Sequence, residues 1–96
     1  MKYYIVSFDR RLDGRYRQFH DEFVRNAAIL RWSHYIKSSY VIGTTMNARE
    51  LSEHFRVTAE KYQISTRHLI FGVDLGDPAG LMPIGAWDWI RKQTGE

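Results

Sequence analysis

Residues 30–45, Leu-Arg-Trp-Ser-His-Tyr-Ile-Lys-Ser-Ser-Tyr-Val-Ile-Gly-Thr-Thr, decide the fold because they hold two strand patterns separated by a short turn. In the first half, side chains alternate with a period of two, which places Trp32, His34 and Ile36 on one face. The second half is rich in aromatic and β-branched residues, and the two serines between the halves suit a turn. This stretch therefore predicts a β-hairpin.

The segments on either side of the hairpin have helical periodicity. Before it, Tyr16, Phe19 and Phe23 recur at helical spacing while charged residues fill the other positions. After it, Asn47 and Glu50 have the spacing of a capping box. The second helix carries one stripe of side chains at helical spacing: Leu51, Phe55, Thr58, Ala59 and Tyr62.

Two further strands are predicted, at residues 3–8 and 68–73, where apolar residues dominate. A loop rich in glycine and proline follows at residues 76–80, and a short closing segment at 86–91. The order βαββαβ is that of an α+β, ferredoxin-like sandwich, a four-stranded antiparallel sheet with two helices on one face, here with a C-terminal segment added. We expect the first and third strands to be central and parallel to each other, and the second and fourth to be edges.

The chain of 96 residues is short enough for a single domain, with a core at about residues 2–75 and a tryptophan-containing tail at 76–96. It is 44% hydrophobic, which is typical of a folded protein. A chain of this size buries only about two-thirds of its unfolded surface, and the second face of the sheet lacks helices in this topology. Because bare apolar faces mark interfaces, we expect a homodimer formed through the open sheet face or the tail.

Several classes of protein are excluded by what the sequence lacks. There is no cysteine, which removes disulfides, thiolate nucleophiles and cysteine-based metal sites. Motifs for phosphate loops, nucleophile elbows and zinc proteases are also missing. The sequence contains no apolar run of membrane-spanning length and no signal peptide, so we expect a cytoplasmic protein without a membrane partner.

Positive charge is concentrated in the first part of the chain. Residues 1–37 hold eight lysines and arginines against four acids, whereas the rest holds six against seven. A basic segment suits a polyanion such as RNA or DNA, and the alternative is an ordinary solvated surface with local salt bridges. The residues that we expect to contact phosphates are Arg10, Arg11, Arg15, Arg17 and Arg67.

Two stretches resemble a known family. The opening strand Tyr-Ile-Val-Ser-Phe-Asp at residues 4–9 and the hairpin Trp-Ser-His-Tyr-Ile-Lys-Ser-Ser-Tyr-Val-Ile at 32–42 resemble the SinR-like proteins, which are allied to the CRISPR-associated Cas-two family. The likeness spans about residues 3–73, and its most specific part is the stretch 32–40. The resemblance implies a ferredoxin-like homodimer in a defence or mobile-element setting, with a protein partner as one option.

The same resemblance implies a role for Asp9. In the Cas-two family the aspartate that ends the first strand is proposed to bind a divalent metal at the dimer axis for phosphodiester cleavage. Other members act without cleavage, as the dimeric bridge of the spacer-integration complex, and the related VapD toxins are ribonucleases. Fold alone therefore leaves the function open.

Asp9 is the leading candidate for catalysis. We expect it to lie at one end of the sheet, beside Thr44 and beside Arg67 and His68. Two Asp9 carboxylates across a two-fold axis could hold Mg²⁺ or Mn²⁺, which would polarise a phosphate and activate a water. The alternative is that Asp9 starts a turn or pairs with a nearby arginine.

His34 and His68 are the other catalytic candidates. His34 could act as a general base or a phosphate donor, although a structural histidine is favoured because it shares a face with Trp32. His68 opens the fourth strand near Asp9. Trp87 and Trp89 could stack on bases, but a role in fixing the tail to the core or to a partner is favoured.

Two functional hypotheses follow. The first is a non-catalytic, homodimeric nucleic-acid-binding protein or scaffold. The second is a metal-dependent endonuclease, more specifically a ribonuclease, that uses Asp9. The site holds few titratable groups, which favours the first hypothesis.

Overall fold

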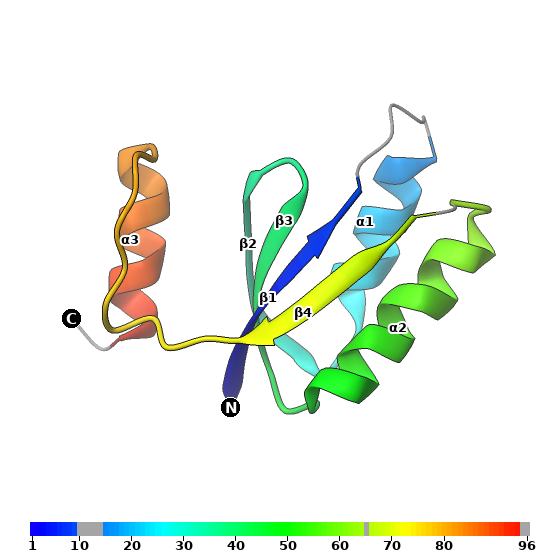
Figure 1. The fold of residues 1–96 in the computed structure, drawn as a ribbon, viewed down its shortest axis with the longest axis horizontal. Helices are drawn as coiled ribbons and strands as arrows, with labels where there is room; N and C mark the ends of the chain where they lie inside the picture. Colours follow the sequence, from blue (N-terminus) through cyan, green and yellow to red (C-terminus); the bar gives the residue numbers. More distant parts are fainter. Residues whose placement is uncertain (10–14, 65, 95–96) are drawn as a thin grey trace.

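The computed structural model describes residues 1–9, 15–64 and 66–94, which form a small α+β fold with an open four-stranded antiparallel sheet and three helices (Figure 1). The strands and the first two helices lie where the sequence patterns predicted them, and the closing segment is a third helix. In chain order the elements are β1 (Lys2–Phe8), α1 (Tyr16–Arg25), β2 (Ile29–Ile36), β3 (Ser39–Thr44), α2 (Ala48–Lys61), β4 (His68–Gly72) and α3 (Ile84–Gln93).

The strands are arranged in the order β2-β3-β1-β4, so β1 and β3 are central and β2 and β4 are edges. The expectation that β1 and β3 are parallel is wrong. Lys2 pairs with Thr44 and Ser7 with Ser39, in an antiparallel register. Because the hairpin turn reverses the chain between β2 and β3, and β2 runs in the same direction as β1, β3 must run against β1. The end of β1 therefore meets the start of β3.

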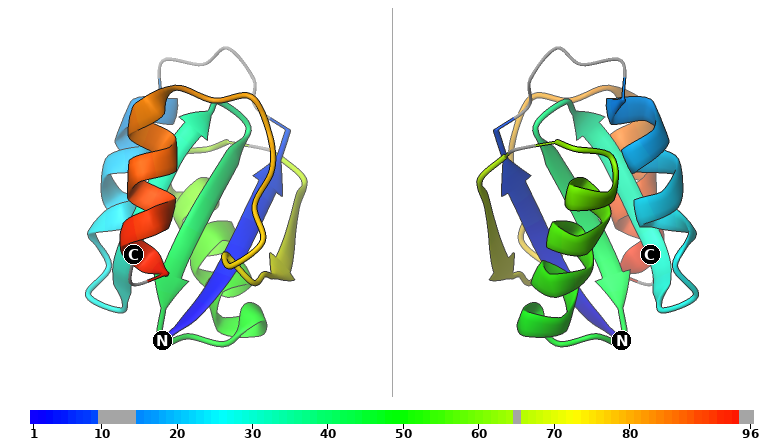
Figure 2. Two further views of the ribbon diagram at one scale, coloured as in Figure 1. Left: turned by 90° about the vertical axis from the view of Figure 1, so that its left-hand side faces the viewer. Right: turned by 90° about the vertical axis from the view of Figure 1, so that its right-hand side faces the viewer.

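The core lies between the sheet and the two helices that cover one of its faces, α1 and α2 (Figure 2). Tyr4, Val6 and Phe8 alternate into it from β1, as the period of two requires. The capping box at Asn47 is present: Glu50 N–H donates to Asn47 Oδ1 at 2.8 Å, and Asn47 N–H donates to Glu50 Oε1 at 3.1 Å. The largest fully buried side chains are Tyr40, Phe19, Phe23, Phe55, Ile42 and Leu51.

Helix α3 lies on the opposite side of the sheet, which we call the outer face (Figure 2). It contacts β2 and buries Ala86, and the Tyr3 hydroxyl donates to Gln93 Oε1 at 3.0 Å. The sequence predicted a bare outer face. The structure differs, because the tail folds back over the β2–β3 half of this face. Its other half stays open, and there Leu69 and Phe71 of β4 are 57% and 56% exposed. None of the described helices is long and apolar enough to cross a membrane.

Candidate functional site

The pairing of β1 with β4 brings Asp9, Arg67 and His68 together at one end of the sheet. Phe8 pairs with His68, and the Asp9 N–H donates to the Arg67 carbonyl at 3.0 Å. The Thr66 hydroxyl donates to the Asp9 carbonyl at 2.5 Å. Backbone pairing therefore fixes this cluster, as the sequence predicted for the start of β4.

Thr44, which we expected beside Asp9, lies elsewhere. It pairs with Lys2 at the opposite end of β1. Its hydroxyl donates to the Ala28 carbonyl at 2.6 Å and accepts from the Met46 N–H at 3.1 Å. The error follows directly from the direction assigned to β3, and it removes Thr44 from the candidate site.

The Asp9 carboxylate is engaged by Arg67. Arg67 Nε lies 2.8 Å from Asp9 Oδ2, and this hydrogen bond raises the pKa of Arg67 above its usual value. The Arg67 side chain nevertheless remains 92% exposed, and that of Asp9 52%. Because the bond to Asp9 uses Nε, the Nη groups of this exposed guanidinium can still donate to an anion.

A divalent metal fits this cluster poorly. Mg²⁺ requires near-octahedral coordination by oxygens and commonly uses carboxylates. Among the described residues no group of three or more histidine and acidic side chains is placed to hold a metal ion. Asp9 contributes one carboxylate, which an arginine already contacts. A second chain would have to supply the remaining protein ligands.

The segments that carry Arg15, Arg17 and Arg67 lie at this end of the molecule, where β1 ends and α1 and β4 begin (Figure 1). Arg15 and Arg17 are exposed at the start of α1, whose first turn holds no acid. Arg15 Nη1 donates to Gln63 Oε1 at 3.2 Å, so its guanidinium reaches the end of α2. We call Arg15, Arg17 and Arg67 the arginine cluster. The predicted phosphate contacts Arg10 and Arg11 lie outside the described residues.

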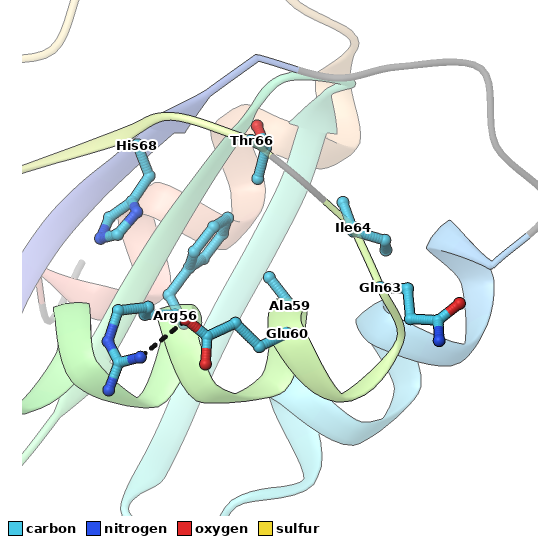
Figure 3. Close-up of a pocket in the computed structure, with 8 residues that line it drawn as sticks. Arg56, Ala59, Glu60, Gln63, Ile64, Thr66 and His68 are labelled. Carbon is cyan, nitrogen blue, oxygen red and sulfur yellow. Dashed lines mark hydrogen bonds and ion pairs between the residues drawn. The ribbon is translucent and has the colours of Figure 1, made fainter.

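A groove of about 510 Å³ lies between α2 and the start of β4 (Figure 3). The groove, which we call the α2–β4 groove, has an apolar part and a polar rim. On the rim, Arg56 is paired with Glu60 at 2.8 Å and also with Glu53. The other lining residues are Phe55, Ala59, Gln63, Ile64, Thr66 and His68.

His68 points from β4 toward α2 in this groove (Figure 3). Its Nε2 shares a hydrogen bond of 2.6 Å with Ser52 Oγ, and its ring lies 4.5 Å from that of Phe55. Burial lowers the pKa of His68, because the charged imidazolium loses hydration there. The imidazole is therefore neutral at neutral pH.

His34 lies in an aromatic cluster between α1 and the hairpin, and the hairpin turn reaches the same end of the sheet, where the Phe8 N–H donates to the Ser38 carbonyl at 3.0 Å. Its ring stacks on Tyr40 with centroids 4.3 Å apart, and Nε2 is 3.0 Å from the Lys37 carbonyl and 3.3 Å from the Tyr16 hydroxyl. His20 joins the same cluster through a hydrogen bond of 2.7 Å from Nδ1 to the Tyr40 hydroxyl. These contacts agree with the structural role favoured for His34.

The predicted face of the first hairpin strand is only partly right. Trp32 pairs with Ile42 on the core side, where it contacts His20 edge to face. Ile36 pairs with Ser39, which belongs to the outer face, because the register shifts between Ser33 and Ile36. A bulge of this kind adds a residue and reverses the alternation.

Sequence reasoning missed Ser52 and Gln63. Ser52 is one serine on a predicted helix, and nothing local marks its contact with His68 across the fold. Gln63 follows the last turn of α2 and has a φ of 57°, a left-handed conformation that usually favours glycine or asparagine. A glutamine there carries no sequence signal of that conformation.

Comparison of the chain with protein-family models, with curated proteins and with solved structures finds no match.

Proposed function

We propose that this chain is a ferredoxin-like, homodimeric protein that binds nucleic acid without cleaving it. The proposal rests first on the arginine cluster, in which the exposed Arg15 and Arg17 at the start of α1 lie at the same end of the fold as Arg67. Arginine forks suit phosphate oxygens, and the exposure of Arg67 leaves it accessible to a backbone phosphate. Contacts of this kind are independent of base sequence.

The non-catalytic form of the proposal is supported by the contacts of Asp9. Its carboxylate is bonded to Arg67, and within residues 1–9, 15–64 and 66–94 no group of three or more histidine and acidic side chains could hold a metal ion. A nuclease of the kind implied by the SinR-like resemblance needs that carboxylate on a metal. In the binding role, the same contact simply orients Arg67 for a phosphate.

Homodimerisation is proposed through the open half of the outer face. Leu69 and Phe71 leave an apolar strip on edge strand β4, adjacent to the inner strand β1. Alternating apolar residues on an exposed edge strand are a ready surface for a second chain. A dimer formed there would bring two arginine clusters into one particle, which would double the number of phosphate contacts.

The test is binding of labelled single-stranded RNA and duplex DNA, measured by fluorescence anisotropy over a series of salt concentrations. We expect the affinity to fall with salt, and replacement of Arg15, Arg17 or Arg67 by alanine to reduce the salt slope by about one each. Arg91→Ala is the matched control, because Arg91 is exposed on α3 and paired with Asp88. Absence of salt-dependent binding would refute the proposal.

The same reactions test the nuclease alternative. Each is run with Mg²⁺, Mn²⁺ or EDTA, beside Asp9→Ala, and the substrate is then examined for cleavage. We expect intact substrate in every tube. Cleavage that requires metal and is lost in Asp9→Ala would replace the binding proposal by the nuclease hypothesis.

A further inference from the structure

The α2–β4 groove adjoins the segments that carry Arg15 and Arg67. At one end, Gln63 accepts a hydrogen bond from Arg15 Nη1 at 3.2 Å. On the β4 side, Thr66 and His68 line the groove, and Arg67, which lies between them in sequence, pairs its side chain with Asp9. A polyanion that contacts both Arg15 and Arg67 would therefore pass close to the mouth of this groove.

The size and lining of the groove suit one heteroaromatic ring. Its volume of about 510 Å³ is within the usual range for small-ligand sites. Ile64 and Ala59 supply apolar surface against which the face of a ring can pack, and His68 borders that surface (Figure 3). Such surfaces accept the faces of heteroaromatic bases.

Polar groups are also placed for the edge of such a ring. His68 Nε2 is bonded to Ser52, whereas Nδ1 has no hydrogen-bond partner among the described residues. Glu60 on the rim offers carboxylate oxygens at the opposite wall, where its partner is Arg56 (Figure 3). A base edge carries both donors and acceptors, so it can use both of these groups.

Gln63 adds an independent observation. Its left-handed backbone follows α2, where the Ile64 N–H donates to the Ala59 carbonyl at 2.9 Å and closes the helix end. Glycine would adopt this conformation without strain. The chain instead holds a long amide side chain that lines the groove and accepts the hydrogen bond from Arg15. Strain retained at the edge of a cavity is typical of functional positions.

We infer that the α2–β4 groove holds one unstacked base of a single-stranded nucleic acid, while Arg15 and Arg67 hold the phosphates on either side of it. The inference rests on the proposed nucleic-acid binding and specifies its substrate as single-stranded. A base in a duplex is stacked and paired, and it cannot enter the groove without being extruded. The protein thus binds single strands more tightly than duplexes with the same number of phosphates.

The experiment is a titration of the wild-type protein followed by two-dimensional ¹H–¹⁵N NMR. The probes are adenosine monophosphate and uridine monophosphate, with ribose 5-phosphate as the matched probe that lacks a base. We expect both nucleotides to shift backbone signals across residues 59–68, and ribose 5-phosphate to shift only those near Arg15 and Arg67.

A second measurement uses His68→Ala, with His54→Ala as control, since His54 lies on α2 and bonds the Phe23 carbonyl instead. His68→Ala should weaken binding of a single-stranded RNA by about fivefold, the value of one lost hydrogen bond, and leave duplex binding unchanged. Because both forms are measured on one preparation, a general loss of folding would lower both affinities.

The outcomes separate this inference from the proposed function. The base site would be overturned if the nucleotides and ribose 5-phosphate gave identical shifts and the protein bound single strands and duplexes with equal affinity. Phosphate binding would then still stand. Absence of shifts from every probe, together with no salt-dependent RNA binding, would overturn both.

Discussion

Arg67 Nε lies 2.8 Å from Asp9 Oδ2, so a predicted phosphate ligand and a predicted metal ligand neutralise each other. The pair joins the end of β1 to the start of β4, and the Asp9 N–H to Arg67 carbonyl bond holds the two backbones in place beneath it. Arg67 bonds Oδ2, so a divalent cation on the same carboxylate would lie beside the positive charge of the guanidinium and be repelled by it. The two functional hypotheses thus make opposite demands on Asp9.

Asp9→Asn should strengthen binding to RNA. The change removes a negative charge beside Arg67 while it keeps a side chain of the same shape, so we expect about two- to fivefold tighter binding at low salt. Fluorescence anisotropy with a short single-stranded RNA measures this directly. Asp88→Asn is the matched control, because Asp88 pairs with Arg91 on the far side of the sheet. Weaker binding in Asp9→Asn would show that the carboxylate itself is needed.

Gln63→Gly should stabilise the fold. Glycine relieves the left-handed strain at a φ of 57°, and we expect a gain of about 1 kcal/mol in the free energy of unfolding. This corresponds to a rise of about 4–8 °C in Tm for a domain of this size. Urea denaturation and thermal melting both measure it.

The control for this change is Gln63→Ala. Alanine also loses the amide contact with Arg15 but keeps a Cβ, so it should give no stabilisation. Equal stability of the two variants would mean that the backbone at this position is not strained. A Gln63→Gly protein that is more stable but binds single strands less well would show why glutamine is present.

The sequence predicted the elements well because each carries its own local signal. The capping box at Asn47 and the stripe that includes Leu51 and Phe55 mark α2 without reference to the rest of the chain. The alternation of Tyr4, Val6 and Phe8 marks β1 in the same way.

The arrangement of these elements relative to one another was harder to predict from the sequence. The direction of β3 relative to β1 depends on how the hairpin and the crossover combine, and the error in it misplaced Thr44. The bulge that turns Ile36 to the outer face changes the alternation without any glycine or proline to signal it. Contacts such as Ser52 with His68 join residues 16 positions apart and depend on packing alone.

Acidification should destabilise the protein in part through His68. Burial lowers the pKa of this imidazole in the folded state, so the unfolded chain takes up the proton at the higher pH. The contribution of neutral His68 to the free energy of unfolding is fully present above the unfolded pKa of about 6.5. It is lost as the pH falls below that value toward the pKa of the folded state.

The measurement is urea denaturation of wild type and His68→Gln at about pH 7.5 and pH 5.5. Glutamine can still bond Ser52 but does not titrate in this range, so the variant should lose less stability on acidification than the wild type. His20, His34 and His54 remain in both proteins, and their contribution cancels in the comparison. Equal losses in the two proteins would mean that His68 is hydrated in the folded state.

Phe71→Lys should convert the proposed homodimer to a monomer. Phe71 pairs with Ile5 and is 56% exposed on the open half of the outer face, so a charge there costs the monomer little. A dimer interface of standard size buries about 800 Å² on each partner, and a lysine at its centre would have to be desolvated without a partner. Sedimentation equilibrium at micromolar protein should show the loss of the dimer.

Val57→Lys is the matched control for that change. Val57 is 51% exposed on α2, which covers the opposite face of the sheet. The substitution therefore adds the same charge at a similarly exposed position, away from the open half of the outer face. It should leave the dimer intact. A wild-type protein that is monomeric at all concentrations, or a Phe71→Lys protein that still dimerises, would refute this interface. If Val57→Lys alone dissociates the dimer, the interface is the helical face, and the open half of the outer face is not the site of dimerisation.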